Sequence, residues 1–264
     1  MRQALSLDLL HSGQHGSIPG RMVLDPVMLT QLSSDLCCVL KHDHARFVDN
    51  DASSCYDRII VGLGMLAARK CGMPSHAIRT HADALKFMKY TVKTVYGISG
   101  NNYHGTVFSP LFGTGQGSGA SPAIWLSLVV ILLQTLDRLI PDRINFSSLS
   151  GNIVQSRLSD AFVDDTSLGF TSSSDNTDIN GLITRLEKVA QTWEHLLFLS
   201  GGKLNLAKCS WFIVRWEWKR AVPLYDPSCP RIEKSRFTME TRSTIPRLST
   251  GHHGRNLHAC LVSS

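Results

Sequence analysis

The sequence has little that would place the protein outside a reducing, aqueous compartment. Its 7 cysteines include no Cys-x-x-Cys pair, and their odd number and wide spacing disfavour a disulfide framework. The longest apolar run, Ala123–Leu133, is interrupted by Ser127 and is too short to span a bilayer. The leucine-rich start contains Asp8 and does not resemble a signal peptide. We therefore expect an intracellular protein, neither secreted nor in a membrane, in the nucleus or the cytoplasm.

Acidic residues are the scarcer charged class. The 27 Lys and Arg residues outnumber the 21 Asp and Glu residues, and the isoelectric point is near 9.0. This balance permits a nucleic-acid partner without requiring one. An apolar fraction of 43% is sufficient for a packed core, and 264 residues allow one domain or two.

The sequence also lacks a standard zinc finger. His252, His253, His258 and Cys260 cluster near the end, but their spacing matches no such motif. From about Pro223 the chain is rich in Arg, Ser, Thr, Pro and His and shows little periodicity. We expect residues 221–264 to form a basic, poorly structured tail.

Two adjacent carboxylates are the most informative feature that is present. Asp164 and Asp165 end the apolar run Ala161–Val163, and Thr166–Phe170 follows at once. This pattern predicts a hairpin with carboxylates at its tip. Two like charges repel each other unless a cation lies between them, and a divalent metal is the simplest such cation. Asp-Asp is also common at ordinary turns, so this block needs support from others.

A second acidic block lies upstream. Phe47–Asp51 reads as a strand that ends in acid, and Ser53 or Ser54 is placed to cap a helix over about Cys55–Arg69. Asp51 is therefore expected at the carboxyl end of a strand, where α/β folds often place chemistry. Asp49 is expected on the same strand face as a nearby acid outside the site, because its distance to Tyr56 does not fit the pattern formed by Asp51, Tyr56 and Asp57.

A glycine-rich block follows at Gly113–Gly119. Glycine at alternate positions lets the backbone approach a ligand closely. Ser121 is expected to cap a helix that begins at Pro122 and runs to Leu139.

These blocks, in this order, resemble the reverse transcriptase palm, in particular that of retrotransposons without long terminal repeats. Five segments carry the resemblance: Gln14–Arg21 as the Gln-x-Gly segment, Asp51 with Tyr56 and Asp57 as motif A, Gln116-Gly117 with Ser121-Pro122 as motif B, Phe162–Asp165 as motif C, and Ser200–Cys209 as motif D.

The resemblance implies a mixed α/β (α+β) fold, a polymerase palm whose antiparallel sheet is backed by helices. Residues 1–40 would form partial fingers, residues 41–220 the palm and residues 221–264 the tail, with no clear thumb. Helices are expected over about 75–95 and 176–199, an irregular connection over 140–156, and strands over 203–218. Few residues precede Gln14, so we expect the palm core of a larger polyprotein, with weak or absent activity alone.

The resemblance also implies the chemistry. An RNA-directed DNA polymerase joins a dNTP to a DNA primer on an RNA template with two Mg²⁺ ions, for which Mn²⁺ can substitute. It assigns metal binding and catalysis to Asp51, Asp164 and Asp165, and a proton-donor role to Lys208. Nucleotide binding would fall to Ala52, Tyr56, Gln116 and Gly117, and phosphate-backbone contact to Arg21 and Lys203.

Three alternatives stay open at this point. One is a catalytically inactive remnant that at most binds nucleic acid. Another is a palm-type RNA-dependent RNA polymerase, which is disfavoured by Tyr56, because a large aromatic there would exclude a 2′-hydroxyl. A reverse transcriptase of the group II intron or telomerase type has a similar palm.

Overall fold

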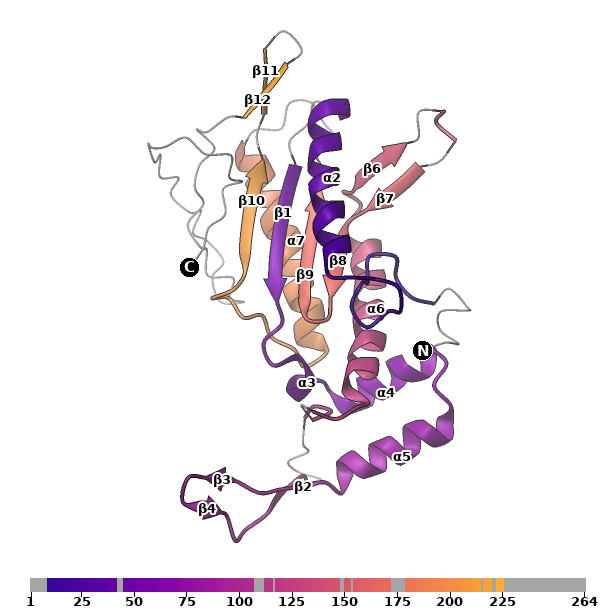
Figure 1. Cartoon of the computed structure of the whole chain (residues 1–264), viewed down its shortest axis with the longest axis vertical. Coiled ribbons are helices and arrows are strands. Elements are labelled where there is room, and N and C mark those ends of the chain that lie inside the picture. The colour runs from indigo at the N-terminus through magenta and orange to yellow at the C-terminus, as the bar shows by residue number, and fades with distance from the viewer. Residues whose placement is uncertain are drawn as a thin grey trace.

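The computed structural model of the protein describes residues 9–41, 45–106, 112–115, 117–147, 150–152, 154–171, 179–214, 216–219 and 222–225. Their fold is mixed α/β with antiparallel sheets, as the sequence predicts (Figure 1). The boundaries 1–40, 41–220 and 221–264 stay predictions, and residues 226–264, with the histidine cluster, lie outside the described part.

A four-stranded antiparallel sheet in the order β10-β1-β9-β8 forms the centre. Its strands are β1 (Ala45–Asp51), β8 (Ser159–Phe162), β9 (Asp165–Phe170) and β10 (Ser210–Val214). Because successive side chains alternate between the two faces, β1 serves two separate cores. Val48 packs in the large core, whereas Phe47 packs on the other face with Cys37.

Two long helices supply most of the large core. These are α6 (Ser121–Leu139) and α7 (Ile179–Leu199), whose bounds the sequence predicts to within a few residues. By length and composition alone α6 could cross a membrane. Its Leu133 and Leu136 are fully buried against the sheet and α7, and burying each such side chain contributes about 1.5–3 kcal/mol. Most of the helix is thus occupied by intramolecular packing.

Helix α2 (Leu24–Lys41) lies over the opposite face of the sheet (Figure 1) and was not expected from the sequence. It contacts β1 and β8, and its Cys37 is buried beside Phe47. Apolar residues are spread around α2, and Val27 and Met28 are exposed, so no single apolar stripe marks it in the sequence.

The helix expected over Cys55–Arg69 is two helices, α3 (Cys55–Arg58) and α4 (Val61–Lys70). The backbone between them is used elsewhere: the Ile60 amide donates to the Ser200 carbonyl at 3.0 Å, and the Ile59 carbonyl accepts from Gly113 at 2.8 Å. These tertiary hydrogen bonds replace helical ones, so the single-helix prediction was wrong here.

The next predicted helix also ends early. Helix α5 (Ser75–Lys86) stops nine residues before Val95, and a two-stranded arm follows, made of β2 (Lys89–Tyr90), β3 (Lys93–Thr94), β4 (Gly97–Ile98) and β5 (Tyr103–His104). Residues 89–95 are rich in β-branched and aromatic side chains, which favour strands over helix.

Two further hairpins lie at the other end of the molecule. The connection expected to be irregular contains β6 (Ile144–Ser147) and β7 (Val154–Arg157), and the strand region after α7 continues into β11 (Trp216–Lys219) and β12 (Val222–Tyr225). Residues 203–209 form turns rather than strand, with Leu204 in an isolated bridge to Ala52.

Candidate active site

Strand pairing brings the two acidic blocks together. In the antiparallel register of β1 and β9, Asp51 lies directly opposite Asp165, and the Ala52 amide donates to the Asp164 carbonyl at 3.2 Å. Directly opposite Cα atoms in such a ladder are about 4.5–5.5 Å apart. Residues more than a hundred positions apart in the sequence thus present their carboxyl groups at one end of the sheet.

The turn that carries Asp164 is held from both sides. Val163 has a left-handed backbone with φ of 61°, an unusual conformation for a β-branched residue. The indole N–H of Trp125, on α6, donates to the Val163 carbonyl at 2.6 Å. On the other side Gly16 approaches so closely that a Cβ there would lie 2.4 Å from the Val163 nitrogen. The Gln-x-Gly segment therefore acts as a support for the acidic turn.

The electrostatics show that the carboxylates affect one another. Partial burial raises the pKa of Asp165, and the neighbouring charges of Asp164 and Asp51 raise it further, while Lys208 lowers it. The Lys208 ammonium lies 3.4 Å from the Asp51 carboxylate, although the lysine side chain is 66% exposed. Lysine therefore compensates part of the excess negative charge at the site.

No complete metal cage is formed. Within the described ranges, no three His, Cys, Asp or Glu side chains converge closely enough to hold a metal ion. Asp51 is buried, Asp164 is half-buried and Asp165 is exposed, so they present hard oxygen donors in an open arrangement. Mg²⁺ is commonly bound by only one or two carboxylates together with substrate phosphates, and this donor set fits that mode.

Asp49, the nearby acid that the sequence places outside the site, has a separate partner. It lies two residues from Asp51, opposite Ser167, whose hydroxyl donates to its carboxylate at 2.5 Å. Burial raises the pKa of Asp49, and this hydrogen bond opposes the shift. The Asp49 carboxylate is thereby tied to β9.

Tyr56, in the first turn of α3, lies between the acidic turn and the glycine-rich loop. Its ring packs edge-on against Trp125, with ring centroids 6.5 Å apart at 75°. Burial, Cys55 and then the charge of Asp164 raise the pKa of the Tyr56 hydroxyl. The Tyr56 carbonyl accepts from the Thr114 amide at 2.7 Å, which joins motif A to the loop.

The glycine-rich loop packs onto α3 because Gly113 has no side chain. With φ of 85°, a Cβ at this position would lie 2.5 Å from the Asp57 Cα. Gly117 is exposed, and Gln116 lies outside the described residues, so the nucleotide contacts predicted for this pair stay predictions.

Serine does not cap either helix in the way expected. Ser121 is the first residue of α6, and its hydroxyl donates to the carbonyls of Thr114 and Gly115, each at 2.9 Å. Ser54 occupies the N-cap of α3 in a left-handed conformation and makes no side-chain capping bond. Ser121 therefore ties the glycine-rich loop to α6.

Motif D reaches the site mainly through its backbone. The Lys203 carbonyl accepts from the Ser53 amide at 2.7 Å, and the Asn205 amide donates to the Asp51 carbonyl at 2.8 Å. The Lys203 side chain is exposed. Arg21 binds the carbonyls of Ser12 and Gln14 in its own loop. Contact of Lys203 and Arg21 with nucleic acid stays a prediction.

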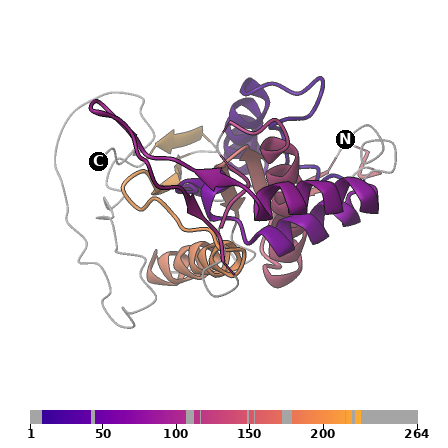
Figure 2. The ribbon, with the colours of Figure 1, turned by 90° about the horizontal axis from the view of Figure 1, so that it is seen from below.

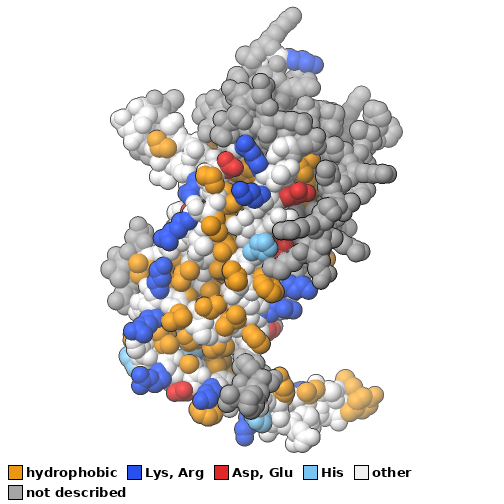
Figure 3. All heavy atoms as spheres, turned by 180° about the vertical axis from the view of Figure 1, so that it is seen from behind, with side chains coloured by type: hydrophobic (Ala, Val, Ile, Leu, Met, Phe, Trp, Pro, Cys, Tyr) orange, Lys and Arg blue, Asp and Glu red, His pale blue; other side chains and the backbone are white. Residues whose placement is uncertain are grey.

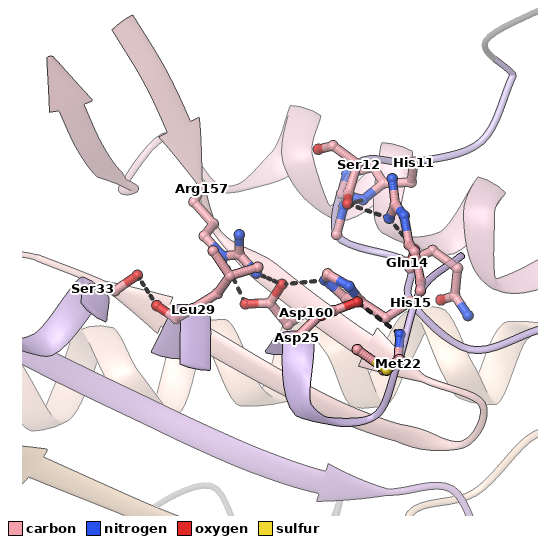
Figure 4. A network of polar contacts seen from close by, with 12 residues as sticks. His11, Ser12, Gln14, His15, Met22, Asp25, Leu29, Ser33, Arg157 and Asp160 are labelled. Carbon is pink, nitrogen blue, oxygen red and sulfur yellow. Dashed lines mark hydrogen bonds and ion pairs between the residues drawn. The ribbon is translucent and has the colours of Figure 1, made fainter. Parts of the chain in front are cut away.

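Sequence reasoning missed a buried polar network beside the Gln-x-Gly segment (Figure 4). The Asp160 carboxylate accepts from Arg157 Nε at 2.7 Å and from His15 Nε2 at 3.1 Å. Burial, followed by the charges of Arg157 and Arg21, lowers the pKa of His15 to about 4. Asp160 lies on β8, the strand that leads into the acidic turn. The network therefore anchors the Gln-x-Gly segment next to that turn. Its only sequence signal is an acid in an apolar strand.

An open cavity of about 860 Å³ extends from the carboxylates between the sheet and α2. Asp51, Asp165 and Lys208 line it together with Phe47, Phe212 and residues of α2. The cavity therefore offers a charged end at the site and an apolar region along the sheet.

The fold of the chain is similar to that of solved telomerase structures. The chain is similar to apo telomerase from Candida tropicalis, with a TM-score of 0.50 and 13% identity over 80% of this chain and 36% of that one. The chain has a reverse-transcriptase-like fold. The same TM-score and identity are found with C. tropicalis telomerase in complex with a TWJ fragment of telomeric RNA, covering 80% of this chain and 33% of that one. The chain thus spans about a third of the length of these structures. No protein-family model and no curated protein matches the sequence.

Proposed function

We propose that this reverse-transcriptase-like chain is the palm of an RNA-directed DNA polymerase from a retrotransposon without long terminal repeats. The observation that carries the proposal is the register of β1 and β9, which places Asp51 opposite Asp165 with Asp164 hydrogen-bonded to Ala52. The retrotransposon assignment rests on the order of the five sequence motifs and on the Ser200–Cys209 block in particular.

In this proposal Asp51 and Asp164 bind two Mg²⁺ ions, or Mn²⁺ in their place, and Asp165 acts further from the reacting atoms. The register that places Asp51 opposite Asp165, and the charges of Asp164 and Asp51 that raise the pKa of Asp165, support cation binding. When bound, such ions activate the primer 3′-hydroxyl and neutralise charge on the leaving pyrophosphate. The carbonyl of Ala52 is a further candidate ligand.

The remaining residues position the substrates. Tyr56 would lie under the sugar of the dNTP and exclude a 2′-hydroxyl, and Gln116 and Gly117 would line the nucleotide pocket. Lys208 would protonate the leaving pyrophosphate, and Arg21 and Lys203 would contact the phosphate backbone of an RNA template or DNA primer. The complex of one telomerase neighbour with telomeric RNA supports a nucleic-acid partner for this fold.

A test of the proposal is extension of an oligo(dT) primer on poly(rA) with dTTP and Mg²⁺ or Mn²⁺. We expect extension by the protein and none by Asp164→Asn. Asp49→Asn is the matched control, because it changes an acid on the same strand face and can keep a hydrogen bond to Ser167. Equal activity of wild type and Asp164→Asn would refute the assignment of the site.

A second candidate is a non-catalytic protein that binds nucleic acid. The ion pair of Lys208 with Asp51 favours it, because the ammonium compensates the charge of a carboxylate that the polymerase would use to bind a cation. Under this reading the folded wild type binds primer–template but extends nothing with either metal, which distinguishes it from the polymerase.

A further inference from the structure

The two-stranded arm between α5 and the glycine-rich loop projects away from the rest of the molecule (Figure 2). Lys89 and Tyr90 pair with His104 and Tyr103, and Lys93 and Thr94 pair with Ile98 and Gly97. The Ser99 amide also donates to the Val92 carbonyl at 2.8 Å. The arm is therefore a hairpin that no element in the described part of the chain covers over its length.

Large apolar side chains are concentrated on this arm although none of the residues that the structure describes buries them. At its tip Val95 is 93% exposed and Tyr96 97% exposed. Figure 3 shows hydrophobic side chains gathered at this tip, at the lower right. Further exposed apolar residues lie along the arm and at its base: Phe87, Tyr90, Val92, Ile98, Tyr103 and Phe112. Large exposed apolar patches mark interaction surfaces. A two-stranded hairpin alone has no core in which these side chains could be buried, so they do not stabilise the arm itself.

The charge of the arm has one sign. Between Asp83 and Asp137 the sequence contains no Asp or Glu, and its charged residues there are Lys86, Lys89 and Lys93. Surfaces that bind single-stranded nucleic acid combine lysines with exposed aromatic rings: the cations contact phosphates and the rings stack on bases. A purely apolar protein partner would not account for the lysines beside the rings or for the lack of acidic residues.

The base of the arm leads to the candidate active site. A second open cavity, of about 660 Å³, is lined there by Tyr90, Tyr103 and Phe112 together with Gly115, Ser118 and Asp57. Gly115 and Ser118 belong to the loop predicted to bind the nucleotide, and Asp57 follows Tyr56 in α3. A single strand of nucleic acid lying on the arm would therefore run towards the candidate active site.

We propose that the arm binds single-stranded nucleic acid, with Tyr90, Tyr96 and Tyr103 stacking on bases and Lys89 and Lys93 contacting phosphates. The inference rests on the proposed function to identify the bound strand, which would be the single-stranded template on its way to the site. Stacking accepts any base, so binding is independent of sequence.

The test is fluorescence anisotropy with labelled 20-nucleotide oligo(U) and oligo(dT) in EDTA, without dNTP. Because neither metal nor catalysis is involved, Asp164→Asn is expected to bind like wild type even where it abolishes extension. We expect Tyr96→Ala and Tyr103→Ala each to raise the Kd by roughly 5- to 150-fold, the range for loss of one stacked base. Tyr96→Phe and Tyr103→Phe keep the ring and should bind normally.

Phe198→Ala is the matched control, since Phe198 is an exposed aromatic residue on α7. Tyr96 is almost wholly exposed, so Tyr96→Ala cannot lose binding by unfolding the protein. Unchanged affinity of both alanine variants for both oligonucleotides would overturn the proposal. The RNA and DNA probes show which strand chemistry the arm prefers.

The lysines provide an independent measurement. Each phosphate contact on a single strand contributes about 0.7 to the slope of log K against log salt. Lys89→Gln with Lys93→Gln should therefore lower the slope by about 1.4, whereas Lys70→Gln, at the end of α4, should not. An unchanged slope, together with loss of self-association in Tyr96→Ala by sedimentation, would overturn the proposal in favour of contact with a second copy.

Discussion

The ammonium of Lys208 lies 3.4 Å from the carboxylate of Asp51, across from Asp165 on the neighbouring strand. A cation from motif D thus already compensates charge at the site that we propose to bind Mg²⁺. Lysine and metal would act on the same carboxylate, which makes the role of Lys208 testable without any nucleic acid.

Replacing Lys208 by Gln should raise the pKa of Asp165 further, because Lys208 lowers this pKa and Asp164 and Asp51 raise it. The shift can be measured by NMR titration of the Asp165 carboxyl carbon. Lys203→Gln is the control, since its backbone carbonyl makes the structural contact and its side chain is exposed. Identical titrations of both variants would contradict the prediction.

Tyr56→Ala should raise the incorporation of ribonucleotides relative to deoxyribonucleotides. Removing the ring opens space at the 2′ position, and steric pockets of this kind discriminate by roughly 10- to 100-fold. The measurement is the ratio of kcat/KM for UTP and dTTP on poly(rA)–oligo(dT). Tyr56→Phe keeps the ring and should keep the selectivity; unchanged selectivity in Tyr56→Ala would remove this role.

Trp125→Phe should loosen the acidic turn. The indole N–H donates to the Val163 carbonyl, and the loss of such a bond to a half-buried carbonyl costs about 1–3 kcal/mol of unfolding free energy. Because Val163 precedes Asp164, we also expect weaker Mn²⁺ binding, measured by calorimetry. Trp193→Phe changes a buried tryptophan of α7 in the same core and should affect stability without affecting Mn²⁺. Equal Mn²⁺ affinity in both variants would show that the turn holds its shape unaided.

Gly113→Ala should destabilise the fold by about 2–5 kcal/mol. A left-handed backbone costs a residue with a Cβ about 1–2 kcal/mol, and the overlap with the Asp57 backbone adds about 1–3 kcal/mol. Gly117→Ala separates the two effects, because Gly117 has a similar φ of 93° and no atom within 4 Å of an added Cβ. Urea unfolding should show only the smaller loss for Gly117→Ala; equal losses would mean that the loop shifts to relieve the overlap.

Acid should weaken the fold through His15. Its folded pKa is lowered to about 4, from an ordinary value of 6.5, by burial and by Arg157 and Arg21. The unfolded chain therefore takes up the proton first, and the free energy of unfolding falls as the pH drops from about 6.5 to about 4. His15→Gln cannot titrate and should reduce the slope in this window by up to one proton equivalent. His76→Gln, exposed on α5, should leave the slope unchanged.

The sequence predicted the elements whose signal is local. The acidic hairpin, the strand ending in Asp51, and helices α6 and α7 combine apolar periodicity with turn residues, and the structure has them within a few residues of the expected positions. Motif order also predicted that Asp51 and the Asp164-Asp165 pair belong together, and the register of β1 and β9 confirms that they meet.

The remaining features depend on contacts between distant residues. Nothing near Trp125 indicates that its indole supports a turn 38 residues away. Ser121 has the local sequence of a helix cap, and its carbonyl partner Thr114 lies in a loop whose position the local sequence does not reveal. The break between α3 and α4 has the same origin, since Ser200 and Gly113 take its backbone groups. Helix α2 was missed because its apolar residues form no stripe.

The position of β1 inside the sheet has a consequence for the chain as a unit of folding. Its neighbour on one side, β10, comes from Ser210–Val214, some 160 residues later than β1. During synthesis β1 must therefore wait with one edge unpaired until almost all the described chain has emerged. A fragment that stops before Ser210 would keep every acidic residue of the site, yet expose a row of free amide and carbonyl groups to pairing with other molecules. Such a fragment should aggregate.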